Sequence, residues 1–168
     1  MLFSDTASVY GLFQVVFADV ADHLAVATFR LLKRKEPGLT VEAVFKQRVS
    51  DTLKQFRQEL GQFDEGSDVS ESVRNLRDAS DIIAALSNWR NDRIHARVRM
   101  TEDGYALYDK RTGNRLELHR DQLEKKIEQA VKAIVTLEAD VQHLVGQLKW
   151  DEEFEEMFRA LPQMPEAF

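Results

Sequence analysis

The sequence predicts an all-α protein, an up-and-down bundle of four long helices with a small β-hairpin inserted between the third and the fourth. Two observations carry this prediction. Apolar residues recur every three or four positions along four separate stretches, and a shorter stretch between the last two alternates instead. A chain of 168 residues with 43% hydrophobic content suffices for one core, so we expect a single domain over residues 1–168.

The first two helices are predicted over residues 9–32 and 41–63. The apolar face of the first steps by four and three until a basic segment with proline and glycine, residues 33–38, ends it. Thr40 is in the right place to be the N-cap of the second. The second keeps its period until the glycines and acids of residues 61–66, which are typical of a turn.

The third helix is predicted to start at a capping pair, Asp68 and Glu71, and to continue to about His95. The fourth helix, with His119 at its start, has the most regular spacing of apolar residues, from Leu123 to Leu148. A continuous apolar stripe of this length requires a long helical partner.

Two further segments complete the architecture. Glycines punctuate alternating runs at 105–108 and 115–118, which predict a β-hairpin within about 97–118. The tail at 151–168 holds six acids against one arginine, with apolar residues between them. We expect it to form a short fifth helix that docks by its apolar side; a partner-binding or arginine-shielding tail is the alternative.

The composition excludes several classes of function. The absence of cysteine rules out disulfides, thiol nucleophiles and cysteine-ligated zinc, and it favours the cytoplasm. The longest apolar stretch is interrupted by Asp19, Asp22 and His23, and no basic region follows Met1, so we expect neither a membrane span nor a signal peptide. Because the net charge is −6, any contact with nucleic acid must depend on a local basic patch.

The end of the third helix carries such a patch, with four arginines around one histidine: Arg90, Arg93, Arg97, Arg99 and His95. Such a cluster can hold a phosphate or a carboxylate. Arg90 falls within the apolar stripe of the helix. Its guanidinium must therefore pair with a carboxylate, stack on an aromatic ring, or face an interface or a ligand.

Asn91 and His95 lie four residues apart on one helical face, so the amide can orient the imidazole. Arg90 and His95 lie about 140° apart on an ideal helix, so they converge only if the helix loosens or a second protomer contributes. Histidine beside arginine suits RNA cleavage, because imidazole moves a proton, guanidinium stabilises the phosphate and the RNA supplies the attacking 2′-hydroxyl. Neither a metal nor a cofactor is then required.

The arrangement Arg90-Asn91-x-x-x-His95, preceded by Trp89 and followed by a hairpin and another long helix, resembles the HEPN superfamily of nucleotide-binding proteins. In that superfamily, two such motifs face each other across a homodimer and form the active site of metal-independent endoribonucleases of toxin or phage-defence type. Some of these toxins pair with a nucleotidyltransferase-like antitoxin. The resemblance implies that His95 transfers protons, Arg90 stabilises the transition state and Asn91 positions His95. We expect the other arginines of the patch to bind RNA phosphates.

Two departures and two alternatives accompany the resemblance. Ala96 stands where many members have glycine, and Arg97 stands where toxins modified by a nucleotidyltransferase carry tyrosine. Other members are non-catalytic modules for dimerisation or for binding a protein or a nucleotide, which is the alternative function. A metal site is the second alternative, because the pairs Asp19/His23 and Asp140/His143 have helical ligand spacing. The paired Glu-x-x-His motifs of bundle metal sites are absent.

Overall fold

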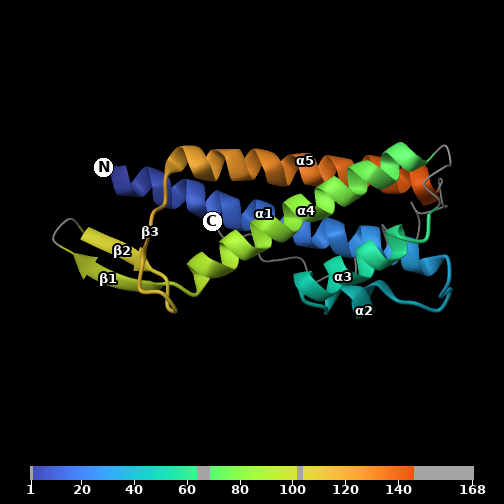
Figure 1. Ribbon diagram of the computed structural model, residues 1–168, viewed down its shortest axis with the longest axis horizontal. Helices are drawn as coiled ribbons and strands as arrows, with labels where there is room; N and C mark the ends of the chain where they lie inside the picture. Colours follow the sequence, from blue (N-terminus) through green and yellow to red (C-terminus); the bar gives the residue numbers. More distant parts are fainter. Residues whose placement is uncertain (1, 64–68, 102–103, 146–168) are drawn as a thin grey trace, which may run out of the picture.

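The computed structural model describes residues 2–63, 69–101 and 104–145. Its elements follow in the order α1 (Leu2–Lys33), α2 (Val41–Phe45), α3 (Val49–Leu60), α4 (Ser70–Ile94), β1 (Arg97–Thr101), β2 (Gly104–Tyr108), β3 (Arg115–Leu116) and α5 (Arg120–Val145) (Figure 1). The protein is a mostly helical bundle with a small sheet, in agreement with the predicted class. The predicted helix at 151–168, the end of the fourth helix at Leu148 and Asp68 of the capping pair lie outside the described residues.

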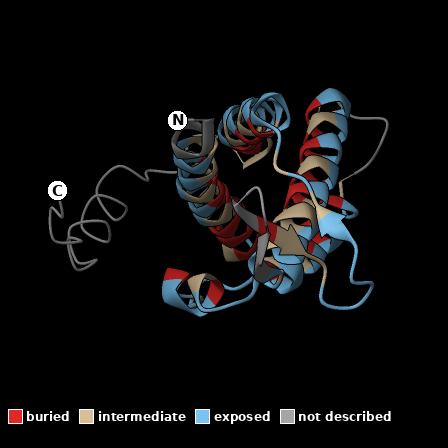
Figure 2. Cartoon of the chain, turned by 90° about the vertical axis from the view of Figure 1, so that its left-hand side faces the viewer, coloured by how far each residue is buried: buried red, intermediate tan, exposed pale blue. Residues whose placement is uncertain are grey.

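One apolar core joins α1, α3, α4 and α5. Its largest completely buried side chains come from all four helices: Phe13, Leu24, Phe56, Leu60, Leu76, Ile83, Leu86, Leu123 and Leu137. Figure 2 shows buried residues along the sides of the helices that face one another. The helical period of the sequence thus corresponds to burial, as expected for amphipathic helices.

The helices do not alternate in direction. α1 and α5 run in the same direction (Figure 1). In keeping with this, His23 of α1 meets Glu138 of α5 at 3.0 Å, far along both helices. Lys35, just after α1, pairs with Glu59 at the end of α3 at 2.8 Å, so α3 also runs with α1. α4 runs against all three (Figure 1). The expected up-down alternation is therefore not the topology of this structure.

The second predicted helix, 41–63, is two helices. The chain leaves helical geometry between them, and Arg48 has an extended backbone with φ −73° and ψ 149°. α2 joins a small separate apolar cluster with the end of α1: Ala25, Phe29, Leu32, Val41 and Val44. α3 packs into the main core instead. The chain therefore reverses twice between α1 and α3, which is why these two helices are parallel.

The expected hairpin at 97–118 is a three-stranded antiparallel sheet in the order β1-β2-β3. The two alternating runs do pair, with Leu107 opposite Leu116. β1, however, pairs with β2 along its whole length, from Arg97 opposite Tyr108 to Thr101 opposite Gly104. The sheet therefore begins directly after α4, and its first strand contains Arg97 and Arg99 of the arginine patch.

α1 is the one described helix that is long and apolar enough to cross a membrane. This criterion has little weight by itself, because a helix in the core of a protein also meets it. In α1, 44% of the apolar window is buried within the protein, and His23 pairs with Glu138 of α5 along its length.

Candidate functional site

The start of α1, the end of α4, the start of α5 and the sheet meet at one end of the molecule (Figure 1). Trp89 of α4 is central there. Its ring packs edge-on against the ring of Phe13 in α1, with 5.0 Å between the centroids and 82° between the planes. This aromatic contact holds the last turns of α4 against α1.

Arg90 is half-buried and faces α1. Its Nε donates a hydrogen bond to Oε1 of Gln14 at 2.8 Å, and its guanidinium carbon lies 5.1 Å from the centroid of the Phe17 ring. The sequence allowed Arg90 to pair with a carboxylate, stack on an aromatic ring, or face an interface or a ligand. In the structure it stacks on the Phe17 ring and hydrogen-bonds to the Gln14 amide. Arg90 therefore ties α4 to α1.

Asn91 and His95 are both exposed. His95 is the C-cap of α4, with φ −90° and ψ 2°, and its backbone N–H donates to the Asn91 carbonyl at 3.1 Å. The contact that the structure shows between these two residues is thus a backbone one, whereas the sequence predicted a side-chain contact. The imidazole of His95 faces solvent at the end of the helix.

Arg90 and His95 do not converge within one protomer. α4 stays helical through Ile94, so the two side chains keep their separation of about 140° around the axis. Arg90 is directed at α1, and His95 is exposed. The single chain therefore does not by itself assemble the predicted pair of catalytic groups.

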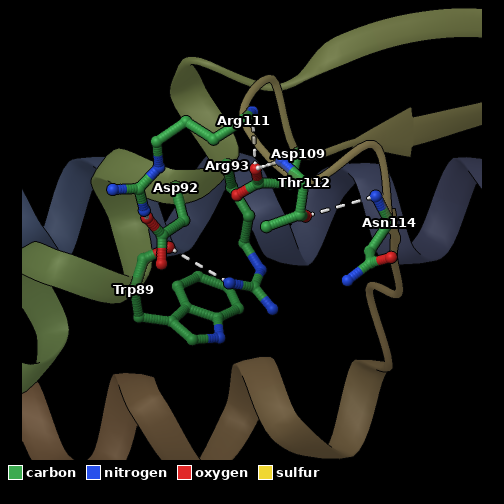
Figure 3. Close-up of polar contacts among 7 residues, drawn as sticks. All are labelled: Trp89, Asp92, Arg93, Asp109, Arg111, Thr112 and Asn114. Atoms are coloured by element: carbon green, nitrogen blue, oxygen red, sulfur yellow. Dashed lines mark hydrogen bonds and ion pairs between the residues drawn. The ribbon is translucent and has the colours of Figure 1, made fainter.

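Arg93 packs on Trp89. Its guanidinium carbon lies 3.8 Å from the ring centroid, and Nη1 donates to the Trp89 carbonyl at 3.2 Å (Figure 3). Nε is buried and has no hydrogen-bond partner among the described residues. Burial lowers the pKa of the Arg93 guanidinium, and the charges of Asp92 and Tyr10 partly offset this effect. Such a guanidinium remains charged and holds unused donors.

Lys126 of α5 brings a second cation to the same indole, with Nζ 5.0 Å from the Trp89 ring centroid. Burial, and then the charge of Arg93, lower the pKa of Lys126. Tyr10 of α1 lies near Arg90 and Arg93 of α4. Burial raises the pKa of its hydroxyl, and the nearby Gln14 side chain and the positive charges of Arg90 and Arg93 partly offset this effect. Sequence reasoning missed Lys126 and Tyr10, because nothing local to either residue indicates that they share a site.

The turn between β2 and β3 adds another arginine. The Asp109 carboxylate accepts the backbone N–H groups of Arg111 at 2.7 Å and Thr112 at 2.8 Å, and these bonds lower the pKa of Asp109 (Figure 3). Gly113 has φ +71°, a left-handed conformation that favours glycine. Nη2 of Arg111 lies 3.8 Å from the Asp92 carboxylate of α4. The turn therefore contacts the end of α4.

Arg97 and Arg99 belong to the sheet. Arg97 is exposed on β1 opposite Tyr108, and the backbone of Arg99 pairs opposite Ala106. The expected cluster around His95 is thus divided between a helix and a strand. The division arises because the chain changes from helix to strand directly after Ala96.

An open groove of about 510 Å³ lies beside this cluster, between the start of α1, the sheet and the segment that leads into α5. Its walls carry one aromatic ring, several aliphatic side chains and a polar rim: Thr6, Ala7, Tyr10, Ala106, Leu107, Arg115, Leu116, Glu117, Leu118 and His119. At the rim, Nε2 of His119 lies 2.6 Å from the Glu117 carboxylate. Sequence reasoning did not identify this groove.

Within the described residues, no three histidine or acidic side chains gather so that they could hold a metal ion. His23 instead contacts the Asp19 carbonyl through Nδ1 at 2.8 Å and Glu138 through Nε2 at 3.0 Å. Both ring nitrogens of His23 are thus engaged by protein oxygens, and neither Asp19/His23 nor Asp140/His143 belongs to a metal-binding group among the described residues.

Comparison with known proteins found no matching family model, no matching curated protein and no matching solved structure.

Proposed function

We propose that this protein is a HEPN-like, metal-independent endoribonuclease of toxin or phage-defence type, which acts in the cytoplasm as a homodimer. The observation that carries the proposal is the exposed His95 at the end of α4, beside half-buried and exposed arginines of an otherwise acidic chain. An exposed imidazole in a segment rich in arginine is suited to move protons at an RNA phosphate.

A second protomer supplies what one chain lacks. Ile94 is an exposed aliphatic side chain next to His95, with 44% of its surface accessible, and it favours an interface at this end of α4. In a two-fold dimer through α4 and the sheet, the His95 of one copy approaches the arginines of the other. The composite site therefore does not require Arg90 and His95 of one chain to converge.

The chemistry follows from the groups present. A neutral His95 takes the proton of the 2′-hydroxyl, the oxygen attacks the adjacent phosphorus, and the bond from phosphorus to the 5′-oxygen breaks. An imidazolium returns a proton to the leaving oxygen. The arginines stabilise the charge on the pentavalent phosphate. The products are a 2′,3′-cyclic phosphate and a 5′-hydroxyl end.

The test is RNA cleavage in excess EDTA by the purified protein. We expect cleavage to persist under chelation and to be lost in His95→Ala, while His143→Ala, which changes an exposed histidine of α5, retains it. DNA and 2′-O-methyl RNA should remain intact, because neither has the attacking hydroxyl. Activity that disappears with EDTA and returns with magnesium or manganese would contradict the mechanism.

The second candidate is a non-catalytic HEPN-like module for dimerisation or for binding a nucleotide or a protein. One observation favours it. Arg90, the residue expected to stabilise the transition state, is instead engaged in packing against Gln14 and Phe17. A dimer that binds a nucleotide without cleaving RNA would establish it. A nucleotidyltransferase-like antitoxin stays a proposed partner for the catalytic form, although Arg97 occupies the position of the modified tyrosine.

A further inference from the structure

Arg93 and Lys126 form a pair of cations on one aromatic ring. The two charged groups lie 3.8 Å and 5.0 Å from the Trp89 centroid, and both are partly desolvated. Arg93 uses one donor, toward a backbone carbonyl, and among the described residues no carboxylate pairs with Lys126. Two like charges in such a place repel each other, and a bound anion would relieve the repulsion.

The acid next to Arg93 in sequence, Asp92, offsets the charge of this pair only in part. Asp92 approaches Arg111 of the β2–β3 turn at 3.8 Å (Figure 3). Arg111 thus takes up part of the negative charge of Asp92. The cation pair therefore retains a net positive charge, in a protein whose net charge is −6.

Tyr10 connects the cation pair to the groove. It lines the groove and also lies within electrostatic reach of Arg93. A volume of about 510 Å³ falls in the range of sites for small organic ligands. The walls are an aromatic ring and the aliphatic side chains of Leu107, Leu116 and Leu118. Such a surface suits the flat face of a nucleobase, and the Glu117–His119 pair at the rim can hydrogen-bond to a base edge.

We propose that single-stranded RNA binds across this end of the molecule, with one phosphate on Arg93 and Lys126 and the neighbouring base unstacked into the groove beside Tyr10. The proposal takes RNA as the ligand class from the proposed function and keeps Arg93 of the arginine patch as a phosphate contact. It adds Lys126, Tyr10 and the groove, which lie outside the motif. A base held in the groove must be free of its partner strand, so the site selects single strands over duplexes.

The experiment measures the affinity of the full chain for a fluorescent 2′-O-methyl oligoribonucleotide, a single strand that cannot be cleaved. We expect Tyr10→Leu to weaken binding by roughly tenfold, because it removes the stacking ring and keeps an apolar side chain. Lys126→Met should weaken binding and reduce the slope of log affinity against log salt by about 0.7, the change expected for one lost phosphate contact on a single strand. Lys126→Arg should restore both.

The matched control is Lys132→Met, which removes an exposed lysine from another part of α5 and should leave affinity nearly unchanged. Unchanged circular dichroism melting curves show that each variant is folded. Equal affinity for a duplex of the same length would overturn the proposal. So would the absence of an effect from both Tyr10→Leu and Lys126→Met, or the absence of binding by the wild type.

Binding and cleavage fail separately. If RNA is cleaved in EDTA but neither Tyr10→Leu nor Lys126→Met changes KM or the oligonucleotide affinity, RNA does not bind in the groove, and the ribonuclease proposal is retained. If the groove variants weaken binding while no cleavage is detected, the ribonuclease is wrong and the single-strand site stands.

Discussion

At the scale of single residues, the environment of each charge decides what the charge does. Arg90 and Arg93 are three positions apart on α4, but Arg90 contacts Phe17 of α1 and Arg93 contacts Trp89 of its own helix. Stacking on a ring keeps a guanidinium charged while part of its surface is buried. Arg90 therefore stabilises the packing of two helices, and Arg93 keeps donors for a ligand.

The Asp109 carboxylate in the β2–β3 turn gives a prediction about pH. Hydrogen bonds from two backbone N–H groups lower the pKa of Asp109 in the folded protein. A lowered folded pKa contributes stability above the unfolded value, about 3.9, and this contribution is lost as the pH falls through the folded value. Asp109→Asn should thus be less stable than wild type at pH 7, and the difference should shrink in acid. Urea unfolding at both pH values measures it; a difference independent of pH would contradict the assignment.

At the scale of elements, strand pairing outcompetes the helix at the end of α4. The run from Arg97 to Thr101 alternates and includes Val98 and Thr101, whose branched side chains favour strands. The five residues of β1 pair with β2, and the hydrogen bonds of this pairing replace those that a longer helix would have made. A break of this kind moves Arg97 out of the helix.

The core faces of the helices give a second prediction. Leu86 of α4 is 1% exposed within the main core, so Leu86→Ala removes buried carbon atoms and leaves a cavity. We expect a loss of about 2–5 kcal/mol in the free energy of unfolding. Val135→Ala, on an α5 side chain that is 57% exposed, should change it by less than about 0.5 kcal/mol. Denaturant titration compares the two, and equal effects would mean that Leu86 is not a core residue.

The β2–β3 turn gives a third prediction. Gly113 has φ +71°, and a side chain there costs about 1–2 kcal/mol by backbone strain, although the space around it is open. Gly113→Ala should therefore destabilise the protein by that amount. Gly38→Ala is the matched control, because Gly38 is also in open space and does not have a left-handed φ. If both variants melt at the same temperature, the strain at Gly113 is negligible.

At the scale of the whole molecule, the long helices bring distant segments of the chain to one end. The Arg90–Gln14 hydrogen bond joins residues 76 positions apart, and Lys126 comes from a third helix to the same indole. α1 and α5 run in parallel, so both begin at the end where α4 stops (Figure 1). The parallel arrangement thus places Tyr10, Trp89 and Lys126 together.

The proposed dimer gives the fourth prediction. Light scattering at micromolar concentration should give about twice the chain mass of 19.4 kDa. Ile94→Asp adds a charge at the proposed interface and should shift the protein to monomer and reduce RNA cleavage. Val135→Asp, at a more exposed aliphatic residue of α5, should leave the dimer intact. Dissociation by Val135→Asp and not by Ile94→Asp would place the interface on α5 instead.

The sequence by itself determined the features that depend on neighbours in the chain. The helical periods of α1, α4 and α5 and the alternation of β2 and β3 are local patterns, and the structure confirms all of them. The same reasoning located the arginine and histidine segment at the end of α4. It treated 41–63 as one helix, because an unbroken apolar period does not reveal that its two halves pack on different surfaces.

Only the tertiary structure decided how these elements are oriented and what surrounds the arginines. The parallel course of α1 and α5 depends on the double reversal around α2, and the sequence contains no local signal for it. Tyr10 and Lys126 join Trp89 through contacts between separate helices, which periodicity along one helix cannot encode. The candidate site therefore combines a motif visible in the sequence with partners that packing alone brings to it.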